Sequence, residues 1–224
     1  MAFEVLDEHE QGELVQKWLR ENAMSIAIGI VLGLLLIFGW QQWKVHRARV
    51  AIQAAAQYQA LVDAQVANRT DDALTIADSL RKEYPDSVYS VFAAMRQADM
   101  ANAGGNLKSA TADLEWAEQH AKEPALKALA TINLARARLG QNEADAALKL
   151  VDGLPKTDYT AVAAELRGDI LSKLARTADA RAAYQDAISH LDAQSPNRTL
   201  VQMKLDNLAS APTAAAVAKE SSGS

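Results

Sequence analysis

The residue types that most often carry out chemistry are scarce in this chain and widely separated. Cysteine is absent, so the sequence offers no thiolate metal ligand, no disulfide and no cysteine nucleophile. No two histidines stand one helical turn apart, which is the spacing of helical zinc ligands. The four histidines lie on separate segments, at His9, His46, His120 and His190. We therefore expect no metal site and no cofactor.

Sequence motifs of nucleotide-binding and hydrolytic enzymes are also missing. The chain has no glycine-rich phosphate loop, no nucleophile elbow and no His-Glu-x-x-His pattern. No lysine follows the pair Gly104-Gly105 at the spacing of a phosphate-binding loop, so this pair is better explained as a turn between helices. The numerous carboxylates fall on predicted helix surfaces, where solvation is the simplest explanation. The sequence predicts a protein that is not an enzyme.

The net charge of −5 is concentrated at the N-terminus. Residues 1–21 contain six acidic residues and two basic ones, a net charge of −4. The rest of the chain carries 21 basic and 22 acidic residues, a net charge of −1. A nucleic-acid-binding domain would show a strongly basic patch, so this balance argues against nucleic acid as a partner.

Residues 22–43 are uncharged and mostly apolar. As a helix with a rise of about 1.5 Å per residue they extend about 33 Å, enough to cross a bilayer core about 30 Å thick. A buried core helix of a soluble domain is the alternative interpretation. The flanks favour the membrane, because tryptophans and cations gather at bilayer interfaces. The predicted interfacial anchors are Trp18, Trp40 and Trp43, and the basic residues Lys44, Arg47 and Arg49 follow directly.

The acidic leader, residues 1–21, distinguishes this span from a cleaved signal peptide. A signal peptide would begin with a short basic segment and a shorter apolar core, so we expect an uncleaved anchor. The charges leave the orientation open, because two basic residues precede the span and three follow it. Taken literally, the positive-inside rule would place the large C-terminal part in the cytoplasm, but a margin of one charge decides little.

Within the span, Gly29 and Gly33 form a Gly-x-x-x-Gly pair. Small residues at this spacing let two membrane helices approach closely, because no side chains hold the backbones apart. The pair predicts a surface that packs against another membrane helix. A passive small-residue face is the alternative, since glycine is common in membrane helices.

Small residues recur with a period of 34 to 37 residues in the C-terminal part of the chain. The period is marked by Ala73, Ala110, Ala144 and Ala180. Further small or apolar residues, with one tyrosine, follow four and seven positions later, so each set marks one helical face. In the last unit, the positions that a tetratricopeptide repeat uses for helix packing hold Gly168, Ala180, Tyr184 and Ala187. The sequence therefore predicts an all-α fold, with one N-terminal transmembrane helix followed by a tetratricopeptide-like helical solenoid of about four helix pairs.

Four segments are predicted along the chain: an acidic tail at 1–21, the transmembrane helix at 22–43, the repeat domain at 44–208 and a disordered tail at 209–224. The register of the third helix pair is the least certain, because few residues separate its helices. The predicted pairs are 47–67 with 71–84, 87–103 with 107–121, 125–139 with 143–153, and 160–175 with 177–191, and a helix at 197–208 is predicted to cap them.

A solenoid of this kind presents the first helix of each pair on a concave surface. Side chains of both charge signs, with one methionine, are predicted to project there, which suits a peptide or a partner helix. The alternative is that these residues only solubilise the surface. The candidate partner-binding residues are Met95, Asp99, Asn102, Asn133, Arg136, Glu165, Asp169, Ser172 and Lys173.

Several N-terminal motifs resemble those of one bacterial family. They are Gln-Lys-Trp-Leu-Arg-Glu-Asn at 16–22, Gly-Ile-Val-Leu-Gly-Leu at 29–34, Gly-Trp-Gln-Gln-Trp at 39–43, and Tyr58 with Leu61. With the acidic leader and the repeats, they resemble the YfgM-type ancillary subunit of the SecYEG translocon. The resemblance covers residues 1 to about 208.

The resemblance implies a single-pass protein of the bacterial inner membrane, with a cytoplasmic N-terminus and a periplasmic repeat domain. It implies as partners the lipid bilayer, the SecYEG translocon, the membrane-anchored periplasmic chaperone PpiD, and secretory or envelope proteins in transit. The implied role is to help pass translocated proteins to periplasmic chaperones. Two other roles stay open: an anchored scaffold for envelope or cell-division assembly, and a holdase that binds unfolded chains directly.

Overall fold

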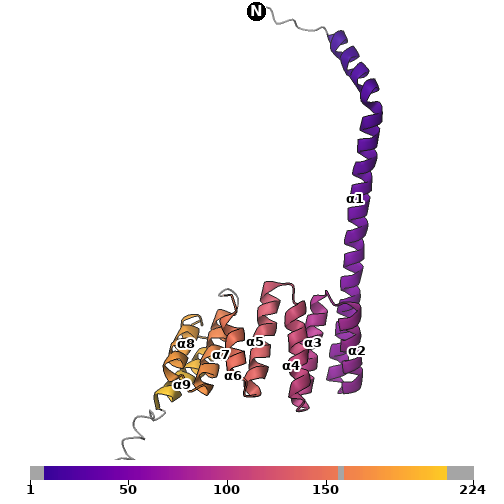
Figure 1. The fold of residues 1–224 in the computed structure, drawn as a ribbon. Helices are drawn as coiled ribbons and strands as arrows, with labels where there is room; N and C mark the ends of the chain where they lie inside the picture. The colour runs from indigo at the N-terminus through magenta and orange to yellow at the C-terminus, as the bar shows by residue number, and fades with distance from the viewer. Residues whose placement is uncertain (1–7, 156–158, 211–224) are drawn as a thin grey trace, which may run out of the picture. The chain divides into compact units, whose positions relative to one another are not determined.

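The computed structural model describes residues 8–155 and 159–210, and all nine elements of regular structure in those ranges are α-helices (Figure 1). The predicted all-α fold class is confirmed. Backbone contacts divide the chain into two compact units, Met1–Gln53 and Ala54–Ser224. The helices are α1 (Glu8–Val66), α2 (Thr70–Glu83), α3 (Val88–Ala103), α4 (Leu107–His120), α5 (Pro124–Gly140), α6 (Ala144–Asp152), α7 (Thr160–Lys173), α8 (Thr177–Ser189) and α9 (Pro196–Ser210).

Helix α1 is uninterrupted over 59 residues. No proline precedes Pro85, and no glycine lies between Gly39 and Gly104, so nothing after the apolar stretch ends the helix before residue 66. The sequence predicted a separate first repeat helix at 47–67. That segment is instead the C-terminal end of α1, so the apolar stretch and the first repeat share one helix.

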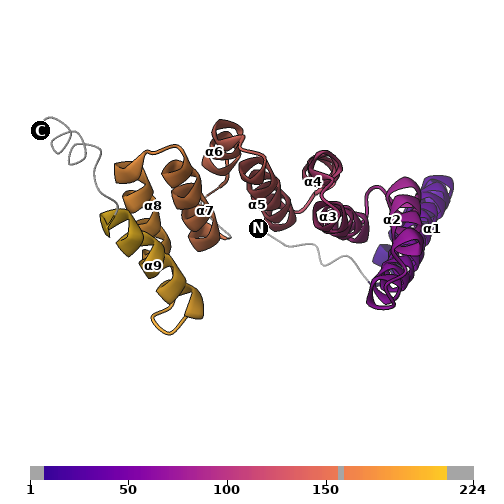
Figure 2. The same ribbon diagram turned by 90° about the horizontal axis from the view of Figure 1, so that it is seen from below.

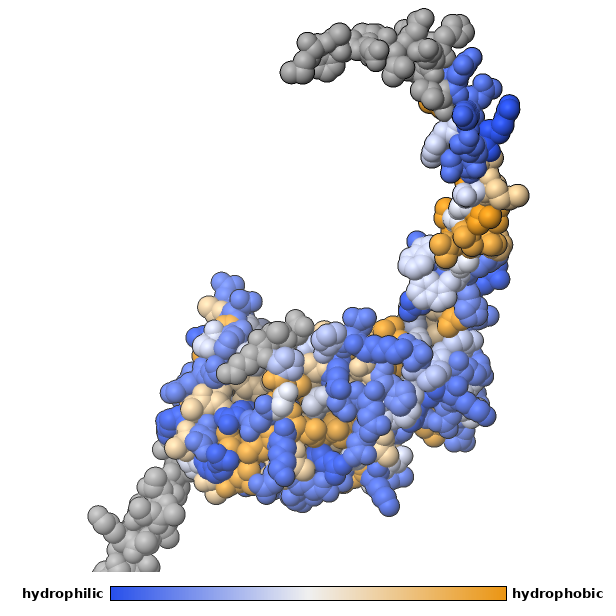
Figure 3. All heavy atoms as spheres, turned by 45° about the horizontal axis from the view of Figure 1, so that its top comes forward, coloured by the Kyte–Doolittle hydropathy of each residue, from blue (hydrophilic) through white to orange (hydrophobic). Residues whose placement is uncertain are grey.

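In the first unit, the middle of α1 forms an apolar band between polar ends (Figure 3). It is the one helix among the described residues that is long and apolar enough to cross a membrane, and none of its most apolar window is buried. At the end of this band, the rings of Trp40 and Trp43 lie 5.3 Å apart. The guanidinium carbon of Arg47 lies 4.7 Å from the centre of the Trp43 ring. Trp40, Trp43 and Arg47 therefore stand together at this end of the band, whereas Trp18 precedes its other end. Their role as interfacial anchors remains a prediction.

In the second unit, the helices follow one another as a row of pairs, α3 with α4, α5 with α6, and α7 with α8 (Figures 1 and 2). The end of α1 and helix α2 form the first pair, and α9 follows the last one. Figure 2 shows α3, α5 and α7 along one side of the row, with α4 and α6 on the other. The predicted tail at 209–224 lies outside the described residues, except for 209 and 210, which end α9.

One type of turn joins the two helices of every pair. Each turn holds one residue in the left-handed region, with φ between 56° and 77°. The next residue donates its backbone N–H to the carbonyl five positions earlier, as Asn106 does to Ala101 at 2.8 Å. This is the Schellman motif, which satisfies the last carbonyls of a helix and reverses the chain. The four left-handed residues are Asn68, Gly105, Asn142 and Ala175.

The helices of each pair pack closely through small buried residues. In the predicted packing set, every alanine is buried: Ala73, Ala110, Ala144, Ala180 and Ala187. The closest approach is in the last pair, where Gly168 faces the ring of Tyr184. A Cβ atom added at Gly168 would lie 2.4 Å from Cε1 of that ring. Only glycine fits there, because no carbon atoms approach so closely without displacement.

A partly buried polar cluster joins the first two pairs. Arg81 on α2 donates one hydrogen bond to Gln97 on α3 at 2.8 Å and one to Asp113 on α4 at 2.6 Å. Its guanidinium carbon also lies 4.5 Å from the centre of the Trp116 ring. Burial raises the pKa of Asp113, and the hydrogen bond and charge of Arg81 oppose that shift. One side chain thus fixes three consecutive helices.

The variant Gly168→Ala tests the close approach of α7 and α8. The added methyl group would displace the Tyr184 ring, so the free energy of unfolding should fall by about 1–3 kcal/mol. A better helix propensity offsets at most about 1 kcal/mol of that loss. Urea denaturation of the full chain in detergent, followed by circular dichroism, measures the change.

Gly140→Ala is the matched control, because nothing lies within 4 Å of a Cβ atom added at Gly140. This variant should leave the stability unchanged or raise it slightly. Equal stability of the two variants would contradict the packing of Tyr184 against Gly168.

Candidate partner-binding groove

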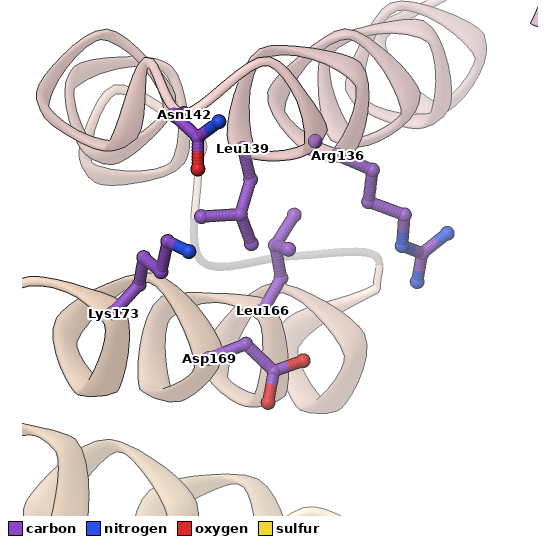
Figure 4. A pocket seen from close by; sticks show the side chains of 7 residues that line it. Arg136, Leu139, Asn142, Leu166, Asp169 and Lys173 are labelled. Carbon is purple, nitrogen blue, oxygen red and sulfur yellow. The ribbon is translucent and has the colours of Figure 1, made fainter. Parts of the chain in front are cut away.

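An open groove of about 500 Å³ lies between α5 and α7 (Figure 4). Leu139 and Leu166 face each other at its centre, and polar side chains stand around them. Three of the residues predicted to contact a partner line this groove together. The residues of this α5–α7 groove are Arg136, Leu139, Gly140, Asn142, Leu166, Asp169 and Lys173.

Helical periodicity places these side chains. On α7, Leu166, Asp169 and Lys173 stand three and four residues apart, so they share one face of the helix. On α5, Arg136 and Leu139 are three residues apart, and Asn142 follows in the Schellman turn after the helix. Leu166 is buried and Leu139 is half-buried, so the floor of the groove is apolar and its rim is polar.

The two acidic residues predicted for the α7 face are paired inside the protein. Lys204 of α9 lies 2.8 Å from a carboxylate oxygen of Glu165 and 2.8 Å from one of Asp169. The hydroxyl of Tyr184 donates a further hydrogen bond to the other Asp169 oxygen at 2.8 Å. Only Asp169 of the two also lines the groove. Their carboxylates are therefore held by α8 and α9.

This cluster shifts two pKa values upward. Burial raises the pKa of Tyr184, and the hydrogen bond to Asp169 raises it further, because the phenolate would lie beside a carboxylate. Burial alone would lower the pKa of Lys204. The hydrogen bonds to Asp169 and Glu165 outweigh it, so the pKa of Lys204 is raised. Both groups hold their protons more firmly in the folded protein.

The cations of the groove lack such partners. Arg136 is exposed, and its guanidinium donates a long hydrogen bond of 3.4 Å to the amide oxygen of Asn133. Lys173 is also exposed, and it makes no ion pair within the described part of the chain. In Figure 4 its side chain points towards Asn142 and away from Asp169. Arg136 and Lys173 are free to meet a ligand.

The other predicted contact residues lie away from the groove lining. Ser172 is exposed on α7 and Asn133 is half-buried on α5. Met95 on α3 is partly buried and packs against two core clusters, so its side chain contributes to the hydrophobic core. Asp99 and Asn102 are exposed on α3, and partial burial raises the pKa of Asp99 against the opposing charge of Arg96. Their contact with a partner remains a prediction.

Sequence reasoning missed the lining residues Leu139, Gly140, Asn142 and Leu166, and also Lys204, which pairs with Asp169. Asn142 could have been found, because asparagine after a helix often adopts the left-handed conformation. Lys204 gave no local signal, since its partners lie 35 and 39 residues earlier in the chain. Among the described residues, no group of three or more histidines, cysteines or carboxylates could hold a metal ion. The groove combines an apolar floor with a polar rim.

A row of helix pairs with a groove on its first helices, joined to a helix able to span a membrane, defines an anchored helical-repeat protein. The chain belongs to the tetratricopeptide repeat-like domain family, whose model matches residues 16–210. Two solved structures of a putative kinesin light chain from Podosopora anserina, with nearly identical TPR-like repeats, have TM-scores of 0.56 and 0.55. Their sequences are 13% and 12% identical to this chain. Each match covers 70% of this chain, and it covers 85% and 86% of the two structures. The predicted solenoid is confirmed by this likeness of fold.

Three curated relatives are named "Ancillary SecYEG translocon subunit". The one from Escherichia coli is 29% identical over 90% of this chain and 97% of the relative. Those from Haemophilus influenzae and Neisseria gonorrhoeae are 26% and 27% identical, each over 93% of this chain and 100% of the relative. The resemblance predicted from the N-terminal motifs is confirmed.

The variant Lys204→Met tests the ion pairs of α9. It leaves the carboxylates of Glu165 and Asp169 close together and partly buried, so the free energy of unfolding at neutral pH should fall by about 1–2 kcal/mol. Lys108→Met is the control, because Lys108 is exposed and makes no ion pair within the described part of the chain. Its effect should stay below about 0.5 kcal/mol.

The same variant has a signature in the pH dependence. The pKa values of Lys204 and Tyr184 are raised above the ordinary values of 10.5 and 10.0. Their contribution to the free energy of unfolding is therefore complete at neutral pH and is lost as the pH rises above about 10. Denaturation of the full chain between neutral pH and pH 11 should show this loss, and Lys204→Met should reduce it. An equal alkaline loss in both proteins would contradict the assignment.

Proposed function

We propose that this protein is a membrane-anchored helical-repeat adaptor associated with the SecYEG translocon, and that it helps pass translocated proteins to periplasmic chaperones. The observation that carries the proposal is the match over at least 90% of the chain to three relatives named as translocon subunits. A match of this extent includes both the apolar helix and the repeats. The adaptor role needs binding surfaces and no catalytic group.

The two parts of the chain suit two different tasks, attachment to the membrane and binding of a polypeptide. The apolar band of α1 is exposed and suits lipid or another membrane helix. The repeat unit offers the α5–α7 groove to a polypeptide. We propose that the first part holds the protein at the membrane and that the second binds a chaperone, such as the membrane-anchored PpiD, or an emerging protein.

We further propose that Gly29 and Gly33 form the contact with a neighbouring membrane helix. Nothing lies within 4 Å of a Cβ atom added at either glycine, so this face of α1 is open. Leu32 and Leu36 flank the glycines on the same face and are exposed, which makes them suitable positions for a reporter.

Site-specific photo-crosslinking tests this contact. A crosslinking amino acid at Leu32 or Leu36 should capture a helix of the translocon or of a membrane-anchored chaperone in living cells. The controls are Val31 and Phe38, which are also apolar and exposed but lie on the opposite face of α1. Equal capture from both faces would overturn the glycine contact, and capture of neither partner would overturn the association with the translocon.

The proposed orientation places residues 1–21 in the cytoplasm and the repeats in the periplasm. A reporter enzyme that is active only in the periplasm, fused after Arg49, should be active. The same reporter fused within the leader, before residue 22, should be inactive. A reporter active only in the cytoplasm should give the reverse pattern at both sites. Cytoplasmic activity after Arg49 would exclude a periplasmic function.

A further inference from the structure

We infer that the α5–α7 groove binds an acidic segment of a partner protein, in which carboxylates flank leucine or similar apolar side chains. The inference rests on the proposed function, in which this groove binds a polypeptide. It names the chemistry of the bound segment. In the folded protein the acidic residues of α7 have partners, whereas the basic residue Lys173 has no ion pair within the described part of the chain.

The sequence of α7 suggests a surface of mixed sign, because Glu165 and Asp169 stand beside Lys173. Folding gives both carboxylates a partner inside the protein, and the cluster with Lys204 keeps a net charge of −1. Lys204 lies 2.8 Å from both carboxylates, and Asp169 also accepts the Tyr184 hydroxyl at 2.8 Å. A basic group of a ligand would have to compete with these contacts for the same oxygen atoms. These oxygen atoms are therefore less available to a cationic segment.

The cations of the groove remain available. Arg136 stands on the α5 wall and Lys173 on the α7 wall, both exposed and without an ion pair among the residues that the structure describes. Including the internal cluster, three cations face two carboxylates here, and the local net charge is +1. Figure 4 shows Arg136 and Lys173 at opposite ends of the groove, with Leu139 and Leu166 between them, so two carboxylates of a ligand could each meet one of these cations. Guanidinium binds carboxylates in a bidentate geometry.

The apolar part of the ligand follows from the floor and from the neighbouring helix. Leu139 and Leu166 meet at the centre of the groove, whose volume of about 500 Å³ can accept side chains of a ligand. On α9, Leu200 lies one helical turn before Lys204 and is 49% exposed, and Met203 is 58% exposed. Leu200 therefore shares a stripe of α9 with Lys204, the lysine that reaches α7.

A folded or extended protein segment fits these features better than a polyanion does. The chain after residue 21 has a net charge of −1, and the neighbouring first helix α3 presents the exposed carboxylate of Asp99. Such near-neutral surroundings lack the run of cations that a long uniform run of phosphates would need. A short segment can place its carboxylates only at Arg136 and Lys173.

Binding of short fluorescent peptides to the full chain in detergent tests the inference. One peptide contains leucine, serine and glutamate, and its charge-reversed counterpart has lysine in place of every glutamate. A third keeps the glutamates and replaces leucine by serine. Fluorescence anisotropy should detect tight binding only for the first. Reversing both groove charges, with Arg136→Glu and Lys173→Glu, should weaken that binding roughly tenfold or more and favour the lysine peptide.

The control pair is Lys149→Glu and Arg181→Glu, which changes the charge equally on exposed positions of α6 and α8, outside the groove. It should leave the binding of the glutamate peptide nearly unchanged. The neutral pair Arg136→Gln and Lys173→Gln should give an intermediate loss, and circular dichroism checks that each variant is folded.

Preference for the lysine peptide, or equal loss from the groove and control variants, would overturn the inference. Binding that survives the change of leucine to serine would overturn its apolar part. These outcomes are separate from the proposed function. If the Leu32 and Leu36 crosslinks to the translocon persist while the peptides show no selectivity, only the chemistry assigned to the groove fails.

Discussion

The repeat unit depends on the close approach of the two helices in each pair. A solenoid has no central core, so each pair must bury its own apolar faces and those it shares with its neighbours. Small residues make this possible, and the contact of Gly168 with the Tyr184 ring is its tightest example. Because α7 is held so close to α8, the hydroxyl of Tyr184 reaches across to Asp169 on the groove side of α7. Tyr184 thus links the packing of the pair to one carboxylate of the groove.

The charge of the groove is in turn set from outside the pair. Lys204 belongs to α9, whose role as a cap would require only apolar contacts, and Val201 supplies these as a fully buried residue. Lys204 gives α9 a second role, because it forms ion pairs with the carboxylates of Glu165 and Asp169. A terminal helix that closes the apolar end of the solenoid also decides which charges the α5–α7 groove presents.

Sequence patterns predicted most of the helices but not the contacts between residues far apart in the chain. The spacing of Ala73, Ala110, Ala144 and Ala180 located the second helices, because helical packing repeats locally along the chain. The start of the first repeat was harder to find. No glycine or proline marks it, and the amphipathic pattern after the span continues a helix that has already begun. Arg136, Asp169 and Lys173 could be predicted from helical faces, whereas Lys204 could not, since no periodicity relates α9 to α7.

One of the four Schellman turns differs from the others in a way that bears on how the chain folds. Asparagine and glycine adopt the left-handed conformation readily, and they hold that position in the first three turns. The fourth holds Ala175, for which this conformation costs about 1–2 kcal/mol. The reversal between α7 and α8 is therefore not favoured in the unfolded chain. Contacts of the folded pair, among them the packing of Tyr184 against Gly168, therefore have to offset this backbone cost at Ala175. The other three turns carry little such cost, because asparagine or glycine holds the left-handed position.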